Sequence, residues 1–285
     1  MSYESALKLE KLTGILIPKT ANFLPESWNS SNAGRLGAKA RLKLYGNPGT
    51  YEGRKKGGLT TQELIKTNPE YFKRFGVTVK KIISYPSPSI KLAEFIGIFM
   101  GDGGVKSKYQ IAISYNNIKD KNYSDYCAKL IKELFLLDST RHINRGNNGA
   151  DIIVSSVELV KFLNSQGFKI GDKIRNKIDI PNWIKKNKEF QRACLKGLMD
   201  TDGGTYFHTY KINEKQYRYL RICFTNCSKP LFKSVVLIFR NLGFTPKIKN
   251  GNRVYIYDLL EIKRYFKEIG SNNERLLLAY QSFYN

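Results

Sequence analysis

The chain has 285 residues, of which 41% are hydrophobic and 13% aromatic, enough to bury a core and to exclude a disordered chain. It carries 48 Lys and Arg against 24 Asp and Glu, a formal net charge of +24 that favours nucleic acid as the partner, with a basic ribosome-type binder or membrane-surface protein as the alternative. Its four cysteines are too few for a disulfide scaffold and lack zinc-site spacing, and no secretory signal or long apolar stretch is present, so we expect a reduced, cytoplasmic protein without a membrane span.

The first 89 residues differ in composition from the rest of the chain. Basic, glycine-rich patches occur at Gly34–Lys39 and Gly53–Gly58, and such a composition buries little apolar area. A short helix, interrupted by a proline, is predicted from Thr60 to Arg74, and Ile83–Ser89 has the composition of a linker. Residues 1–89 are therefore predicted to be a basic N-terminal extension. It is either an arm that lies along a phosphate backbone or a solvated tail with one small packed element.

From residue 90 onward the chain contains an internal repeat. Leu92–Gly104 (LAEFIGIFMGDGG) and Arg192–Gly204 (RACLKGLMDTDGG) align without a gap, so the same Asp-Gly-Gly sequence ends both segments. Each copy continues with alternating strand patterns, a helix, a hairpin and a closing helix. This order predicts an α+β fold of two pseudo-symmetric αββαββα halves, residues 90–185 and 186–285.

The other predicted elements also occur in matching pairs. In chain order within each copy, they are strands at Tyr109–Asn117 and Tyr219–Cys227, helices at Asp120–Leu137 and Lys229–Leu242, hairpins at Thr140–Val154 and Thr245–Tyr257, and closing helices at Ser156–Gln166 and Leu259–Ile269.

Both motif segments are predicted to be helices that carry one stripe of small side chains. Two such helices can pack with their backbones close together, which would place Asp102 beside Asp202. Adjacent carboxylates repel each other, and a divalent cation relieves that repulsion. The alternative is that both acids are solvated members of ordinary Asp-Gly turns. The stripes consist of residues spaced four apart: Ala93, Gly97 and Gly101 in the first helix, and Ala193, Gly197 and Thr201 in the second.

The paired motifs resemble those of a known family. FIGIFMGDGG and LKGLMDTDGG look like the two motifs of single-chain LAGLIDADG homing endonucleases, and the resemblance covers about residues 90–285. Between the motifs, Gly167–Ile184 is similar to the passage that often precedes a second motif in this family. Met100 departs from the family pattern where Asp200 stands in the second copy, but that inner position is not the family's metal ligand. The resemblance implies a site-specific endonuclease, of the kind associated with mobile introns, that hydrolyses phosphodiesters in double-stranded DNA.

The resemblance also assigns the catalytic residues. Asp102 and Asp202 would be the metal-binding catalytic carboxylates, with Gly101 and Thr201 as neighbouring metal ligands. We expect Mg²⁺, and Mn²⁺ or Ca²⁺ could occupy the same sites. A basic residue near the scissile phosphate usually assists catalysis in this family, and Lys249, before the turn of the last hairpin, is the candidate.

The strand patterns predict a DNA-binding surface. Two twisted sheets side by side would form a saddle that follows a duplex, and because the halves differ in sequence we expect a monomer that reads a long non-palindromic target. As a set, the outward-facing polar and cationic side chains favour DNA contact, although a solvated strand face explains any one of them equally well. They are Gln110, Ser114, Asn116, His142, Asn144, Arg145 and Asn147 in the first half, and Arg218, Arg221, Thr225, Lys247, Lys249 and Arg253 in the second.

Other functions are possible on the same fold. An intron RNA maturase would bind RNA and a DNA-binding regulator would bind without cutting, and a bifunctional maturase would keep both acids. An intein is less well supported, because the chain starts at Met1 and its end, Ser282–Asn285, lacks the His-Asn pair of splicing chemistry.

Overall fold

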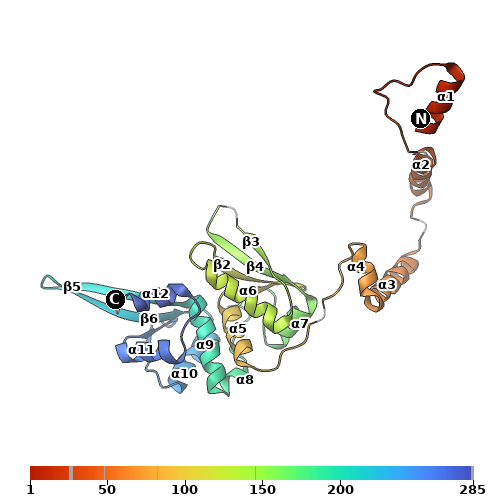
Figure 1. The fold of residues 1–285 in the computed structure, drawn as a ribbon. Helices are drawn as coiled ribbons and strands as arrows, with labels where there is room; N and C mark the ends of the chain where they lie inside the picture. The colour runs from red at the N-terminus through yellow and green to blue at the C-terminus, as the bar shows by residue number, and fades with distance from the viewer. Residues whose placement is uncertain (26–27, 48, 82, 145, 284–285) are drawn as a thin grey trace. The chain divides into compact units, whose positions relative to one another are not determined.

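The computed structural model describes residues 1–25, 28–47, 49–81, 83–144 and 146–283. The chain forms two compact units, residues 1–79 (unit 1) and residues 80–285 (unit 2) (Figure 1). Among the described helices, none has both the length and the apolar character needed to cross a bilayer.

Unit 1 is helical. Its helices are α1 (Tyr3–Thr13), α2 (Trp28–Tyr45), α3 (Tyr51–Thr67) and α4 (Pro69–Arg74). Both basic, glycine-rich patches lie inside helices, α2 and α3, because the lysines, arginines and leucines around the glycines are good helix formers. None of the described residues in these two helices is buried, so they form without packing into a core.

Unit 2 begins before the predicted boundary at residue 90. Ile83 is 8% exposed and belongs to the core of this unit, and Lys80 pairs with Glu158 at 2.6 Å. The ring of Tyr85 also packs against Phe162. The segment predicted to be a linker therefore packs against the first half of unit 2.

The two halves of unit 2 have the predicted αββαββα order. The elements of the first half are α5 (Ile90–Gly101), β1 (Gly103–Ser107), β2 (Gln110–Asn116), α6 (Lys121–Phe135), β3 (Thr140–Ile143), β4 (Gly149–Ser155) and α7 (Val157–Ser165). Those of the second half are α9 (Lys188–Asp202), β5 (Gly203–Ile212), β6 (Lys215–Thr225), α10 (Lys229–Asn241), β7 (Lys247–Lys249), β8 (Arg253–Ile256) and α11 (Leu259–Glu268). The short helix α8 (Asn182–Lys185) precedes the second half, and α12 (Glu274–Gln281) follows it.

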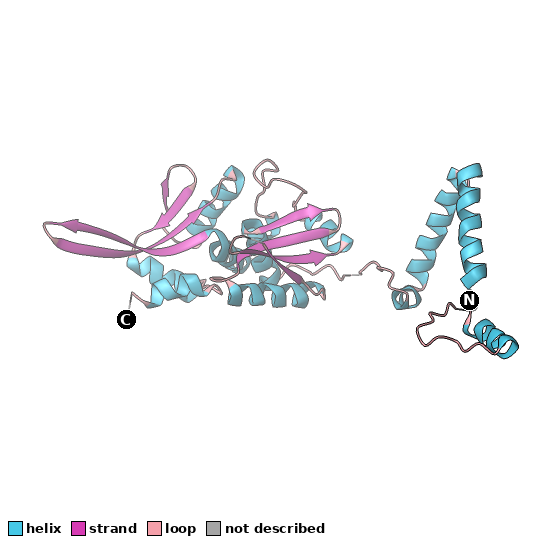
Figure 2. Cartoon of the chain, turned by 90° about the horizontal axis from the view of Figure 1, so that it is seen from above, coloured by secondary structure: helices cyan, strands magenta, loops and turns pink. Residues whose placement is uncertain are grey.

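Each half contains one four-stranded antiparallel sheet. The strand orders are β1-β2-β4-β3 and β5-β6-β8-β7, so the two sheets have the same topology. Figure 1 shows α5 and α9 side by side at the centre of unit 2, and Figure 2 shows the sheets as two separate groups of strands. The predicted fold class is confirmed.

Alternation along the central strands separates a core face from an open face. Ile111 and Ile113 of β2, and Ile222 and Phe224 of β6, are at most 2% exposed and belong to one apolar core that spans both halves. The intervening residues face the other way. The open faces of the two sheets are therefore the polar surfaces of unit 2.

The second hairpin is much longer than the first. Strands β5 and β6 have 10 and 11 residues, against 5 and 7 in β1 and β2. The pairing of β5 with β6 continues without interruption from Gly203 opposite Phe224 to Ile212 opposite Lys215. The hairpin of the second half is thus longer than the corresponding hairpin of the first half.

Candidate active site

The motif helices α5 and α9 are in direct backbone contact. A Cβ atom on Gly97 would collide with the carbonyl oxygen of Cys194, and one on Gly197 would lie 2.8 Å from the backbone nitrogen of Ile98. Ala93 and Ala193 are also buried, at 0% and 7% exposure. The predicted small-residue stripes therefore face each other, since any larger side chain at the two glycines would separate the helices.

The contact continues to the C-terminal ends of both helices. A Cβ atom on Gly101 would collide with the side chain of Thr201. The Thr201 hydroxyl donates to the carbonyl oxygens of Gly197 and Leu198, both at 3.0 Å, which holds the threonine against its own helix. Both helices therefore end at the same level, where the two motif aspartates lie.

Asp102 and Asp202 are half-buried and interact electrostatically. Burial, together with the negative charge of Asp202, raises the pKa of Asp102 to about 6. Burial also raises the pKa of Asp202, opposed by a hydrogen bond from Asn226 Nδ2 to Asp202 Oδ2 at 2.8 Å. The two carboxylates therefore form one acidic site, in which Asp202 has a side-chain partner from the end of β6.

Lys173 lies beside this acidic site, although the sequence did not single it out. Its Nζ donates to the carbonyl oxygen of Met100 at 2.9 Å and also to that of Gly101. Burial lowers the pKa of Lys173, while the charges of Asp202 and Asp102 oppose that change. A parallel bridge between Ile170 and Val105 attaches this segment to β1 and brings the lysine to the end of α5.

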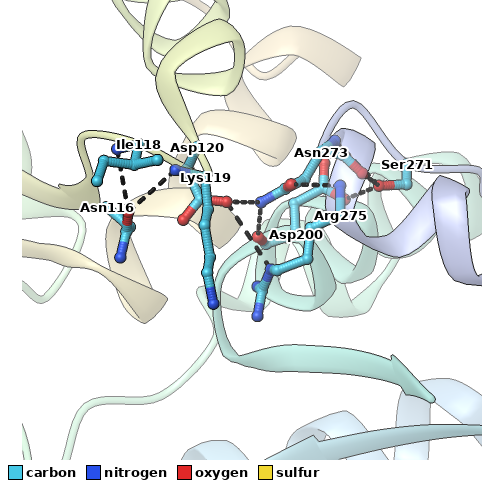
Figure 3. Close-up of polar contacts among 8 residues, drawn as sticks. All are labelled: Asn116, Ile118, Lys119, Asp120, Asp200, Ser271, Asn273 and Arg275. Carbon is cyan, nitrogen blue, oxygen red and sulfur yellow. Dashed lines mark hydrogen bonds and ion pairs between the residues drawn. The ribbon is translucent and has the colours of Figure 1, made fainter. Parts of the chain in front are cut away.

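The segment Ser271–Arg275, here called the clasp, contacts Asp120 and Asp200 (Figure 3). Asn273 Nδ2 donates to Asp120 Oδ1 of the first half at 3.1 Å and to the backbone oxygen of Asp200 at 2.9 Å. The hydroxyl of Ser271 donates to Asp200 Oδ1 at 2.5 Å. Burial raises the pKa of Asp200 to about 7, against the hydrogen bonds that its carboxylate accepts from the Ser271 hydroxyl and the backbone nitrogen of Asn272. The clasp thus ties the end of the second half to the first half.

A pocket opens between the clasp and Asp102. Its lining includes the carboxylates of Asp102, Asp120 and Asp200 and the guanidinium of Arg275, so the pocket carries both negative and positive charge. Its lining residues include Asp102, Ser114, Asn116, Asp120, Asp200, Thr201, Asn273 and Arg275.

The donor atoms at the site suit a hard divalent cation. Within the part of the chain that the structure describes, no three His, Cys, Asp or Glu side chains group as metal ligands. A cation would therefore depend on the two motif carboxylates, together with backbone, water and phosphate oxygens, a set that Mg²⁺ accepts. The carbonyl of Gly101 already accepts from Lys173, and the Thr201 hydroxyl donates to its own helix. Metal binding by Gly101 and Thr201 stays a prediction.

Lys249, the basic residue predicted to assist near the scissile phosphate, lies on the edge strand β7. Its Nζ lies 6.0 Å from the ring centre of Tyr255 and 5.7 Å from that of Tyr257. By contrast, the positive charge of Lys173 works to lower the pKa of both motif aspartates. The structure therefore favours Lys173 over Lys249 as the cation nearest the acidic pair.

Most of the predicted second-half contacts share the open face of their sheet. The register pairs Thr225 with Arg253, Lys249 with Arg253, and Lys247 with Tyr255, which places these side chains on the same face as Arg221. Arg218 was predicted to share this face, but it lies three residues before Arg221 and so points to the opposite face. There its guanidinium lies 3.5 Å from the ring centre of Phe207.

The predicted first-half contacts share a face but are partly occupied by local hydrogen bonds. Gln110, Ser114, Asn116, His142 and Asn144 lie on the open face, where Ser114 Oγ donates to Asp151 Oδ1 at 2.6 Å. Asn116 Oδ1 accepts from the backbone nitrogens of Ile118 and Lys119 (Figure 3), and Asn147 Oδ1 accepts from that of Gly149. Arg145 lies outside the described residues.

A set of tyrosines that was not predicted from the sequence lies on the open face of the second half. Tyr210 stacks on Tyr217 and on Tyr219, with ring centres 5.4 and 5.7 Å apart. Farther along the sheet, Tyr255 stacks on Tyr257, and Arg221 lies 4.8 Å from the Tyr257 ring centre. Their alternate spacing within the strands was the available signal. This face therefore combines aromatic rings with cations, whereas the first-half face is mainly neutral and polar.

Comparison with known proteins gives one family match and several similar structures. Residues 189–270 match the model of the LAGLIDADG-like domain. A replication factor C small subunit of Methanocaldococcus jannaschii is 27% identical over 196 residues, which are 66% of this chain and 10% of that protein. The chain thus spans about a tenth of the length of this relative.

Among solved structures, I-DmoI in complex with DNA and Mn is similar, with 23% identity and a TM-score of 0.43, covering 64% of this chain and 96% of that one. The LAGLIDADG homing endonuclease I-LtrWI bound to target DNA has 14% identity and a TM-score of 0.46, covering 69% of this chain and 89% of that one.

Proposed function

We propose that the chain is a LAGLIDADG homing endonuclease, a site-specific, metal-dependent enzyme that cuts both strands of duplex DNA, and the match of residues 189–270 to the LAGLIDADG-like domain supports this. One observation carries the proposal. Two half-buried carboxylates, Asp102 and Asp202, interact at the ends of two helices whose backbones touch between the sheets. An isolated pair of this kind is electrostatically unfavourable, and a divalent cation with a phosphate would balance it.

The residues around the pair have separate tasks in this proposal. When bound, the divalent cation would activate water and stabilise the charge on the leaving oxygen. Asn226 would hold the Asp202 carboxylate in one orientation through its hydrogen bond. Lys173, which already contacts the end of α5, would place a positive charge next to the scissile phosphate. The open faces of the two sheets would bind a long, non-palindromic duplex, and one chain would suffice.

Single substitutions at the motif aspartates test this function. We expect Asp102→Asn and Asp202→Asn each to reduce Mg²⁺-dependent cleavage of sites selected from a randomised duplex library by about a hundredfold or more, since losing even an outer-shell partner of a metal ligand costs ~10–100-fold. Binding to the same duplex should be largely retained. Asp138→Asn is the matched control, because Asp138 pairs with Lys132 on the surface.

Normal cleavage by both aspartate variants would refute the assignment of the site. A parallel selection with structured RNA separates the maturase alternative, which predicts tighter binding to RNA than to any selected duplex.

A further inference from the structure

Helix α2 and the start of α3 in unit 1 carry a concentrated positive charge. Residues 28–58 contain seven cationic residues and the single acid Glu52; the cations are Arg35, Lys39, Arg41, Lys43, Arg54, Lys55 and Lys56. The ion pairs between described residues of unit 1 lie elsewhere, at Lys66 with Glu63 and Lys73 with Glu70. The charge of α2 is therefore not neutralised by acids of its own unit.

Three of these cations form a row along one face of α2. Arg35, Lys39 and Lys43 follow one another at four-residue spacing, which places them on the same side of the helix. None of the described residues of α2 is buried, so this row faces solvent along its whole length. A row of cations on a straight helix is complementary to the regular spacing of phosphates in a duplex.

The apolar residues of α2 do not form a face that fits a membrane or an apolar partner. Leu36, Leu42 and Leu44 are 55%, 55% and 73% exposed. Their spacing of six and two residues places them on three different sides of the helix. The charge, not the apolar side chains, therefore defines the partner.

We propose that α2 is a second DNA-binding element that grips the phosphate backbone of duplex DNA without reading its sequence. The choice of duplex DNA rests on the proposed function of unit 2, and the binding itself does not. Because unit 1 is covalently joined to unit 2 at residues 79 and 80, its grip raises the effective concentration of unit 2 on any DNA that it touches.

The test is the salt dependence of binding to a random-sequence duplex of about 40 base pairs, measured in EDTA with the full chain. Arg35→Gln, Lys39→Gln and Lys43→Gln are combined in one variant, since glutamine retains helix propensity. If each cation neutralises one phosphate, the log–log slope of affinity against salt should become shallower by about 2 to 3. Lys8→Gln, Lys11→Gln and Lys19→Gln form the matched control, with equal charge loss in the same unit.

The proposal predicts an unchanged slope for the control triple, and wild-type binding for the charge-preserving Arg35→Lys. Equal slopes for the two triple variants would overturn the proposal. So would a triple α2 variant that loses affinity for structured RNA but not for duplex DNA. Because the measurement needs neither metal nor cleavage, it separates the two proposals. A chain that never cuts DNA but shows the α2 effect refutes only the nuclease, and a chain that cuts without the effect refutes only this grip.

Discussion

The two motif aspartates are held in an unfavourable electrostatic state. Asp102 and Asp202 share a partly desolvated site, and both have raised pKa values. The repeat in the sequence was sufficient to predict this pair. It could not predict Lys173 or Asn226, because their contacts join residues 72 and 24 positions apart that only the folded chain brings together.

This electrostatic cost should appear in the pH dependence of stability. The folded state favours the protonated form of Asp102, so the cost is absent below its ordinary pKa of 3.8 and fully present above about 6. Above pH 6, the raised pKa lowers the free energy of unfolding by about 3 kcal/mol. We therefore expect Asp102→Asn to be more stable than wild type by about 2 to 3 kcal/mol at pH 8 in EDTA, with no difference near pH 3, as measured by urea unfolding.

Two comparisons support the interpretation of that measurement. Asp138→Asn should show the opposite sign, because Lys132 lowers the pKa of Asp138 and the charged form is the favoured one. Mg²⁺ should stabilise wild type more than Asp102→Asn. A wild type that gains stability steadily from pH 4 to pH 7, relative to the variant, would contradict the raised pKa.

At the scale of elements, the contact between α5 and α9 determines where the aspartates lie. The stripes of alanine and glycine predicted this contact because helical spacing alone defines the face. Strand faces were harder to predict, since one residue reverses the direction of a side chain. Arg218 and Arg221 were grouped by charge, and the register of β5 with β6 shows that they face opposite ways.

A larger side chain at the helix crossing should separate the helices. We expect Gly97→Val to destabilise unit 2 by about 2 to 3 kcal/mol or more, because its Cβ would collide with the backbone of Cys194 and neither helix can move without losing core contacts. Thermal unfolding provides the measurement. Gly104→Ala in the same motif is the control, since a Cβ atom there meets nothing within 4 Å. Equal melting temperatures for the two variants would show that the helices do not need this close contact.

At the scale of the whole molecule, the clasp joins the two halves of unit 2 through hydrogen bonds. Asn272 Nδ2 donates to Glu94 Oε1 at 2.7 Å, and Asn273 joins Asp120 to the backbone of Asp200. The sequence predicted both halves and their order. It did not predict the clasp or α12, because Ser271–Arg275 has no counterpart in the repeat and shows its purpose only through contacts with the other half.

A double-mutant cycle measures the coupling. Asn273→Ala and Asp120→Ala should each destabilise the chain, and the double variant should cost less than their sum by about 1 kcal/mol, because the hydrogen bond between them is lost only once. Urea unfolding of the four proteins gives the coupling energy. Strict additivity would show that this hydrogen bond does not join the halves.

If the chain binds DNA as proposed, the unequal hairpins give it an asymmetric footprint on the duplex. At about 3.4 Å per residue, the 10 residues of β5 extend about 34 Å, whereas the 5 residues of β1 extend about 17 Å. Base pairs in a duplex rise by about the same 3.4 Å. An enzyme that lays both hairpins along a groove would therefore read roughly twice as many positions on one flank as on the other, and its scission point would sit away from the middle of the sequence that it recognises.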